Sequence, residues 1–255
     1  MDTLTGALNP SLPHYHWWLA LASPMVRNSK CCDWLHIPIC RVNTIEDRKK
    51  VLDDWWGTNT REELLQVIQK LALGEIHANG DGISFDRCEC STPSEWQSYL
   101  ESTDNEELLH TRKFHEVSLR ILGRARFLGF DYVRATTLIR WGHFIEWISD
   151  EELAFLLSFV ANNVQQGFDN WNQYLNSYIL GRSWWAYTAD DSEKAGSLLA
   201  KGNTTNNLNY QQYFSAMQSE GLPNFDDIPF YTKLPVLSAP DSLLRALNIH
   251  NQEAE

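Results

Sequence analysis

Helix start signals recur along the chain and constrain its fold more than any other feature. Thr60 stands three residues before Glu63, and Thr92 stands three residues before Glu95. This is the spacing of a capping box, in which each side chain accepts a hydrogen bond from a free backbone N–H of the first helical turn. Further helix starts are predicted at Asn43–Thr44, Thr103, Ser149 and Asp169. A chain with so many starts is expected to be built from helices.

Apolar side chains follow these starts at helical spacing. Leu64, Leu65, Ile68 and Leu71 form one stripe, and a second stripe runs from Leu153 to Val164. Alternating patterns typical of strands are scarce, and "DGISFDRCEC" (81–90) is interpreted as a short strand or a loop. The sequence therefore predicts an all-α fold.

The expected organisation is a compact multi-helix domain over residues 1–190. Within it, residues 74–93 are rich in Gly, Asp and Cys and are interpreted as a long irregular Cys-rich loop. Residues 191–207 are small and polar, which is typical of a flexible linker. Residues 208–255 are expected to form a C-terminal helix and an extended, Pro-containing tail that packs on the core.

The charge balance excludes some classes of function. The formal net charge is −12, whereas non-specific binding to nucleic acid needs a cationic face. Docking on anionic lipid is disfavoured for the same reason. No segment reaches the roughly 20 apolar residues of a membrane helix, and "HYHWWLALASPMV" (14–26) is expected to be a core helix or an apolar arm. It has no cationic region before it, so the expected location is cytoplasmic.

Five cysteines are the only candidates for a metal site. Four of them, with His36 or His77 nearby, have the ligand types of a tetrahedral zinc site. However, adjacent cysteines and a Cys-x-Cys differ from the usual Cys-x-x-Cys pairs, so reduced thiols are favoured and no cofactor is expected. The candidates are Cys31, Cys32, Cys40, Cys88 and Cys90.

The stretch "FDYVRATTLIRWGHF" (130–144) places charges in an apolar run. Buried charges are tolerated when they are paired, so a core network is favoured over a ligand-binding site. A single helix over about 116–141 would bring Asp131, Arg134 and Trp141 to one side, unless its glycines interrupt it. Arg182, from a later segment, is a candidate partner for Asp131.

Aromatic residues cluster in "FDNWNQYLNSYILGRSWWAY" (168–187), where the helix is expected to end at Gly181. A core role is favoured over an interface or a cage for a nucleotide base. Together, the two stretches supply the candidate ligand-binding or core network: Asp131, Arg134, Arg140, Trp141, Arg182 and Trp185.

Signatures of catalysis are missing from the sequence. There is no Gly-x-Ser-x-Gly elbow, phosphate loop or dinucleotide fingerprint. His110 and His115 are five residues apart, which places them on different sides of a helix. Glu116 and Arg120 are expected to form a surface pair. No catalytic residue is predicted, and a non-enzymatic role is favoured.

Three stretches carry a resemblance to a known family. They are "WWGTNTREELLQVIQKLALGEIHANG" (55–80), residues 130–161 with an Asp-x-x-Arg and an Arg-x-Gly, and residues 168–185 with a Gly-Arg-x-x-Trp. The order and spacing of these stretches resemble those of the motifs in bacterial domain-of-unknown-function family 1266 (YbeU/YbeR type).

The resemblance implies a compact helical bacterial domain and no particular activity. It selects positions where the family motif and the physical interpretation coincide: Asp131, Arg134, Gly181, Arg182 and Trp185. The chain departs from the motif at the expected Arg-x-Gly turn, where the large Trp141 precedes Gly142.

Two hypotheses for function follow. The first is a non-catalytic acidic protein that binds a basic protein partner, such as a bacterial immunity protein that neutralises a toxin. The second is an enzyme or small-ligand-binding domain with a pocket around Asp131, Arg134, Arg182 and the tryptophans. A deep polar pocket would favour the second hypothesis. A filled core with acids gathered on one exposed face would favour the first.

Overall fold

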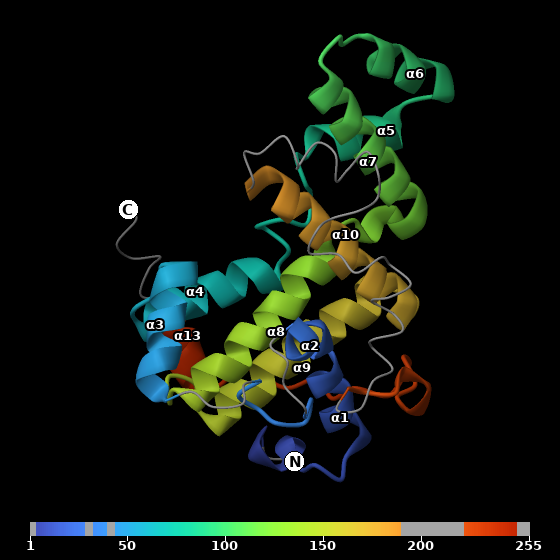
Figure 1. Cartoon of the computed structure of the whole chain (residues 1–255). Coiled ribbons are helices and arrows are strands. Elements are labelled where there is room, and N and C mark those ends of the chain that lie inside the picture. Colours follow the sequence, from blue (N-terminus) through green and yellow to red (C-terminus); the bar gives the residue numbers. More distant parts are fainter. Residues whose placement is uncertain (1–3, 29–32, 40–43, 190–221, 249–255) are drawn as a thin grey trace. The chain divides into compact units, whose positions relative to one another are not determined.

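The computed structural model describes residues 4–28, 33–39, 44–189 and 222–248 (Figure 1). Every regular element in these ranges is a helix, which confirms the all-α prediction. Among the described residues, no helix combines the length and the apolarity needed to span a bilayer. The predicted linker, residues 191–207, lies outside the described ranges.

The described residues fall into two compact units that interleave along the chain, whereas the sequence predicts one continuous domain over 1–190. Unit 1 draws on residues 1–73, 132–166 and 217–255, and unit 2 draws on residues 74–131 and 167–216.

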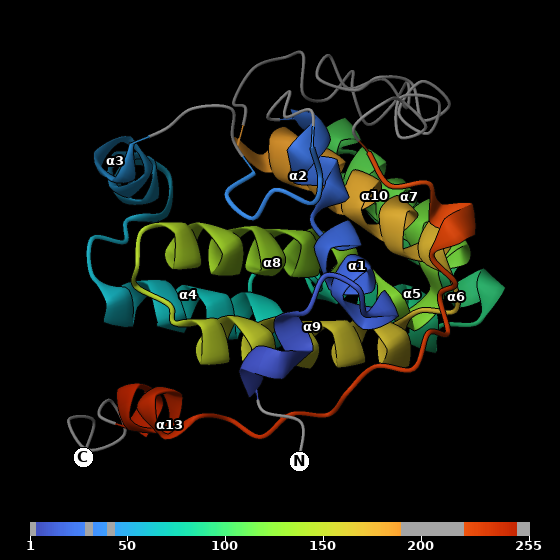
Figure 2. The ribbon, with the colours of Figure 1, turned by 90° about the horizontal axis from the view of Figure 1, so that it is seen from below.

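Unit 1 contains most of the long helices. Helix α4 lies against both α8 and α9 (Figure 2), because Asn163 of α9 donates to Ala72 O at the end of α4 and Leu64 of α4 packs beside Gly142 of α8. The elements are η1 (Leu4–Leu8), α1 (Pro13–Ala20), α2 (Ser23–Asn28), α3 (Ile45–Trp56), α4 (Arg61–Ala72), α8 (Leu128–Phe144), α9 (Asp150–Gly167), η3 (Phe225–Asp227) and α13 (Asp241–Asn248). The first turn of α8 and the last residue of α9 belong to unit 2.

Unit 2 is built around one helix, α7 (Glu106–Leu122), which contacts α5 (Ile83–Cys90), α6 (Pro93–Glu101) and α10 (Trp171–Ala189). A short 3-10 turn, η2 (Gly123–Ala125), follows α7. The helix α5 corrects the sequence interpretation, because residues 83–90 are neither a strand nor a loop. Its start was hidden because Gly82 occupies the N-cap position and the side-chain cap comes from Asp81 instead.

Capping chemistry places most helix starts as the sequence predicts. Thr44, Thr60 and Thr92 each head a capping box, and Ser149 exchanges equivalent bonds with Glu152. Two predictions are wrong by one or two residues. Asn105 rather than Thr103 caps α7, and the Asn170 side chain accepts from Gln173 N at the start of α10, where Asp169 was expected to cap.

The stretch from 116 to 141 is two helices rather than one. The chain turns at Gly123, whose φ of +60° is a conformation that side chains disfavour. Gly129 and Gly142, in contrast, lie inside α8. The predicted single helix over 116–141 is therefore broken at Gly123, whereas Asp131, Arg134 and Trp141 share one helix, α8.

The extended Pro-containing tail of the prediction is present and packs on unit 1. Trp17 Nε1 and the side chain of Gln165 both donate to the carbonyl oxygen of Phe230. Ser158 Oγ donates to Pro235 O at 2.6 Å. The N-terminal apolar segment 14–26 covers most of α1 and the start of α2, with Trp17 and Trp18 fully buried. Of the two predicted alternatives, the core helix is the one present.

Gly181 does not end its helix, as the sequence suggested, but lies within α10. A Cβ at this position would stand 2.6 Å from Cβ of Phe130 and 2.9 Å from Cβ of Phe127. Both neighbouring atoms are fixed by their backbones. The glycine therefore permits close packing of α10 against the start of α8.

The variant Gly181→Ala should accordingly be destabilised by overpacking, by about 1–3 kcal/mol. Gly167→Ala is the matched control, because its new Cβ would meet only Leu128 Cδ1 at 3.9 Å. Urea unfolding of both variants and the parent chain measures the effect. Equal stability of the two variants would contradict this role of Gly181.

Candidate functional site

Asp131 of the candidate network lies in unit 2 and is fully buried. Its Oδ2 accepts hydrogen bonds from the backbone N–H groups of His77 (2.9 Å) and Ala78 (3.1 Å). The carbonyl oxygen of Ala78 in turn accepts from Phe127 N. The carboxylate thereby fastens the loop before α5 to the start of α8. Since a buried carboxylate needs such donors, these bonds explain why it is tolerated here.

The same loop packs against His115, which was not among the site residues predicted from the sequence. His115 of α7 has no exposed surface and sits between the rings of Phe85 and Trp184, each with its centroid 4.5 Å away. A Cβ at Gly80 would lie 2.3 Å from His115 Nε2. The imidazole is therefore enclosed by two aromatic rings and by the backbone of the loop.

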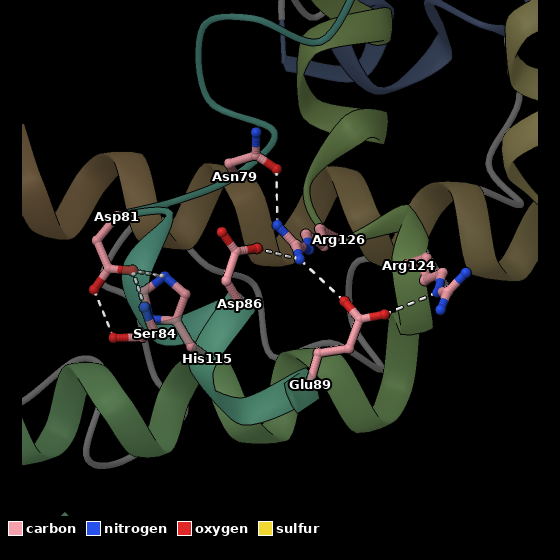
Figure 3. Close-up of polar contacts among 8 residues, drawn as sticks. All are labelled: Asn79, Asp81, Ser84, Asp86, Glu89, His115, Arg124 and Arg126. Carbon is pink, nitrogen blue, oxygen red and sulfur yellow. Dashed lines mark hydrogen bonds and ion pairs between the residues drawn. The ribbon is translucent and has the colours of Figure 1, made fainter. Parts of the chain in front are cut away.

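Hydrogen bonding fixes the tautomer of His115. Its Nδ1 lies 2.8 Å from Thr111 O, and because a carbonyl oxygen only accepts, Nδ1 carries the proton. Nε2 has no hydrogen-bond partner and lies 3.7 Å from Asp81 Oδ1 (Figure 3). Burial lowers the pKa of His115 below its ordinary value of 6.5. The Asp81 carboxylate and the Thr111 carbonyl oppose this shift, and Arg126 adds to it.

Ser84, Asp81 and His115 bring together the residue types of a hydrolytic triad in a different order. Ser84 Oγ donates to Asp81 Oδ2 at 2.7 Å, and Ser84 N donates to Oδ1 at 2.9 Å. In a triad the histidine stands between serine and aspartate and takes the serine proton. Here the aspartate stands between them and caps α5, so the arrangement has no activated nucleophile.

Arg126 forms hydrogen bonds with polar side chains at the surface of this region (Figure 3). Its guanidinium donates to Asn79 Oδ1 (3.0 Å), Asp86 Oδ1 (2.6 Å) and Glu89 Oε2 (3.0 Å). Arg124 donates to the other oxygen of Glu89 at 2.8 Å. The bonds from Arg126 and Arg124 lower the pKa of the Glu89 carboxyl. The network joins α5 to η2 and the residue that follows it, across a solvated surface.

Arg140 belongs to unit 1, where it is fully buried. Its guanidinium donates to four backbone carbonyl oxygens, at distances of 2.6–3.1 Å, from the end of α1 and from the segment before α3. The acceptors are Leu19, Trp34, His36 and Ile37. Arg140 therefore organises irregular backbone.

Arg134 and Trp141 complete the unit 1 part of the network. The Arg134 guanidinium lies over the ring of Trp56 at 5.6 Å, and Arg48 lies over Trp141 at 4.0 Å. The expected turn at residues 140–142 is helical. Gly142 permits close contact there, because a Cβ would stand 2.6 Å from Ile148 Cδ1.

Arg182 and Trp185 belong to unit 2, together with Asp131. Arg182 is half-buried on α10. Trp185 is 44% exposed and lies beside Phe130 at a centroid distance of 6.4 Å. The other described rings of the cluster are buried, as the core interpretation predicts, namely Trp171, Tyr174, Tyr178 and Trp184.

The six candidate residues are therefore divided between the units. Arg134, Arg140 and Trp141 are in unit 1, and the other three are in unit 2. A cleft of about 880 Å³ in unit 1 is lined by none of the six. It lies between η1 and the extended tail, with Leu12 and Leu237 among its walls.

The zinc hypothesis rests largely on residues outside the described ranges, namely Cys31, Cys32 and Cys40. Cys88 and Cys90 are free thiols, and burial raises the pKa of Cys88. Among the described residues, no three His, Cys, Asp or Glu side chains come together as a metal site would require.

His115 was missed because its helical stripe is mostly polar. The buried face of α7 includes Thr111, His115, Ser118 and Leu122, which follow one another at spacings of three or four. That periodicity is visible in the sequence. Only Leu122 is apolar, so hydrophobicity alone does not reveal the buried face.

The described chain is thus an all-helical protein in which the buried Asp131 and Arg140 bind backbone groups. It belongs to the family "Protein of unknown function (DUF1266)", whose model matches residues 51–221. The family resemblance found in the sequence is thereby confirmed.

Two relatives from Escherichia coli (strain K12) are similar to the chain. The uncharacterized protein YbeR is 27% identical over 178 residues, which cover 68% of this chain and 72% of YbeR. The uncharacterized protein YbeU is 27% identical over 166 residues, which cover 65% of this chain and 69% of YbeU. No solved structure matches the chain.

Asp131→Ala should lower the free energy of unfolding by about 1.5–3 kcal/mol, the range for hydrogen bonds to a charged group, because two backbone N–H groups lose their acceptor. Asp104→Ala removes an exposed carboxylate from the same unit and should leave stability nearly unchanged. Urea unfolding compares the variants. Equal effects would mean that Asp131 does not hold the loop.

The free energy of unfolding should also decrease as the pH is lowered, because of His115. The unfolded chain takes up a proton there near pH 6.5, whereas the folded chain takes it up only at lower pH. The unfolding free energy should therefore decrease from about pH 6.5 downward, by at most about 1.4 kcal/mol per pH unit from this group. The decrease should level off below the pKa of the folded protein.

Unfolding in urea at pH 7, 6 and 5 measures this dependence. His115→Gln carries no titratable group and should weaken it, whereas His143→Gln, at a partly exposed position, should leave it intact. An unchanged pH dependence in His115→Gln would exclude His115 as its source.

Proposed function

We propose that the chain is a non-catalytic acidic binding protein that masks a basic protein partner. In its specific form, it is a bacterial immunity protein that acts in the cytoplasm and neutralises a toxin by direct binding. This role requires no cofactor and no catalytic residue.

One observation carries the proposal, and it concerns a segment that we call the acidic arm, residues 88–111. The arm comprises the end of α5, all of α6 and the start of α7. It contains six acids and no Lys or Arg. All six are in exposed positions: Glu89, Glu95, Glu101, Asp104, Glu106 and Glu107. A surface that carries only negative charge attracts a cationic partner and speeds its association.

The two arginines that border the arm both lie over one aromatic ring within it. Arg87 lies over Tyr99 at 4.1 Å, and Arg112 lies over the same ring at 3.7 Å. Arg112 is buried and also donates to Tyr99 O. These two arginines brace α6 against its neighbours. Of the six acids only Glu89 is ion-paired with described arginines, Arg124 and Arg126, so the other five keep their charge.

The interior charges support a binding role in a second way. Asp131 and Arg140 hold backbone groups, and His115 is enclosed by rings. Groups used in this manner are not available to a substrate. Apart from Glu89, which binds two arginines, the acids of the arm face water.

The test is co-purification of the tagged full-length chain from bacterial lysate, followed by mass spectrometry. We expect one stoichiometric basic protein. The variant Glu101→Gln/Asp104→Asn/Glu107→Gln should lose that protein at physiological salt, because the electrostatic attraction of the arm is removed.

A charge-matched control uses Glu151→Gln/Asp169→Asn/Asp226→Asn, which are exposed acids outside the arm. This control should retain the partner. Equal loss in both variants would show that total charge matters rather than the arm. Capture of a small molecule in place of a protein would favour a ligand-binding domain.

A further inference from the structure

One short stretch of the extended tail is fixed at both ends and unbonded in between. Before it, Pro235 O accepts from Ser158 Oγ of α9 at 2.6 Å. After it, Pro240 O accepts from Leu243 N of α13 at 3.0 Å. The stretch between these two anchors, residues 236–239, we call the open segment. Its backbone N–H and C=O groups form no hydrogen bond with any described residue.

The open segment has the form of a strand. No turn or bend interrupts residues 232–240, and the tail runs on as an extended chain to α13 (Figure 2). Exposure alternates along it, because Val236 and Ser238 are exposed whereas Leu237 and Ala239 are partly covered. Alternation with a period of two is that of an extended strand. Val236 is 87% exposed although it is apolar.

The open segment forms one wall of the cleft in unit 1. The volume of this cleft, about 880 Å³, lies within the range of sites that hold a ligand, about 300–1,000 Å³. The polar side chains along the cleft are those of His14, Ser238 and Asp241. His14 Nε2 already lies 2.9 Å from Ala7 O, inside the opposite wall. The unbonded backbone of the open segment is therefore a main polar feature of the cleft.

An extended backbone with unbonded groups matches one kind of occupant. In a strand, alternate residues direct their N–H and C=O groups to the same edge, so two of the four residues can pair with an incoming chain through about four hydrogen bonds. Such an edge is a template for another extended chain. A helix satisfies its own backbone groups and offers none of them to this edge. The occupant that fits is therefore an extended peptide.

We propose that the cleft binds an extended peptide segment of a partner protein, which pairs with the open segment as an added strand. Apolar side chains of the segment lie against the walls of the cleft, and a basic side chain lies beside Asp241, since no Lys or Arg lines the cleft. Proline is excluded at the pairing positions, because it has no N–H group. This docking site goes beyond the proposed function and does not depend on the acidic arm.

A peptide titration of the full-length, ¹⁵N-labelled chain tests the proposal. The probe is the capped peptide Lys-Val-Thr-Val-Thr-Val, which favours an extended form. Without peptide, the amides of residues 236–239 should exchange rapidly with water. With peptide, their signals should shift in a saturable manner and exchange should slow at least fivefold. Amides that are already protected in the free chain, or signals unmoved by the peptide, would overturn the proposal.

An ester analogue of the probe tests whether backbone pairing holds the peptide. It has the same side chains, and esters replace its amides, so it has no N–H donors. The analogue should bind at least tenfold more weakly than the amide peptide. Equal affinities would show that the side chains alone bind, and would refute an added strand.

Two proline variants of the chain form a matched pair. Ser238→Pro and Ala239→Pro each remove one N–H group that has no partner in the described structure, so both should fold normally. Neighbouring N–H groups of a strand point to opposite edges. Only one of the two variants should therefore weaken binding of the amide peptide, by about tenfold. Equal affinities in the two variants, whether weakened or unchanged, would contradict pairing at one edge.

The charge of the occupant and its source are tested separately. Asp241→Asn should weaken binding of the lysine peptide about threefold and leave a peptide with glutamine in place of lysine unaffected. Equal effects on both peptides would refute the basic side chain. Sedimentation of the free chain should show a monomer. A dimer that Ser238→Pro or Ala239→Pro dissociates would identify the occupant as a second copy of the chain and overturn the proposed partner.

Discussion

Unit 1 depends on one buried guanidinium. Arg140 stands in a helix, yet its bonds run to the carbonyl oxygens of Leu19, Trp34, His36 and Ile37. Leu19 O and His36 O also accept from Ala22 N and Ile39 N. A buried carbonyl oxygen without a donor is unfavourable by roughly 1–3 kcal/mol, and so is a buried charge without acceptors. The four carbonyl oxygens thus make the buried guanidinium tolerable. Residues 33–39 have few helical bonds. Arg140 ties them to α8, and Ile39 packs in a hydrophobic cluster with Ala22 and Val26.

Unit 2 uses the opposite charge for the same purpose. Asp131 accepts from two consecutive backbone N–H groups of the loop before α5. The loop then reaches His115, because Gly80 comes close to its ring. The charges in the apolar stretch 130–144 therefore have a clear physical reason. Helices satisfy their own backbone groups, and the irregular segments packed against them need a charged side chain to do so.

The sequence predicted features that are local. A capping box spans three residues, so Thr60 and Thr92 identify their helices without knowledge of the rest of the fold. The errors concern features that depend on distant residues. Gly181 resembles a helix end, but its role is set by Phe127 and Phe130.

Only part of the candidate site could be predicted from the sequence, because the rest also depends on distant residues. The stretch 130–144 showed that charges are buried, and the favoured interpretation was that they are paired. Their partners are backbone groups from residues 19, 34–37 and 77–78, and a backbone group has no signature in the sequence. His115 is a comparable case, because its burial follows from a stripe of polar residues rather than from hydrophobicity.

Charge in this protein has two physical roles, which differ in depth. The buried Asp131 and Arg140 bind the backbone, so their replacement acts first on folding. The exposed acids of the arm have little part in the core. Under the proposed function, replacement of these acids acts on association with a cationic partner and leaves the fold intact.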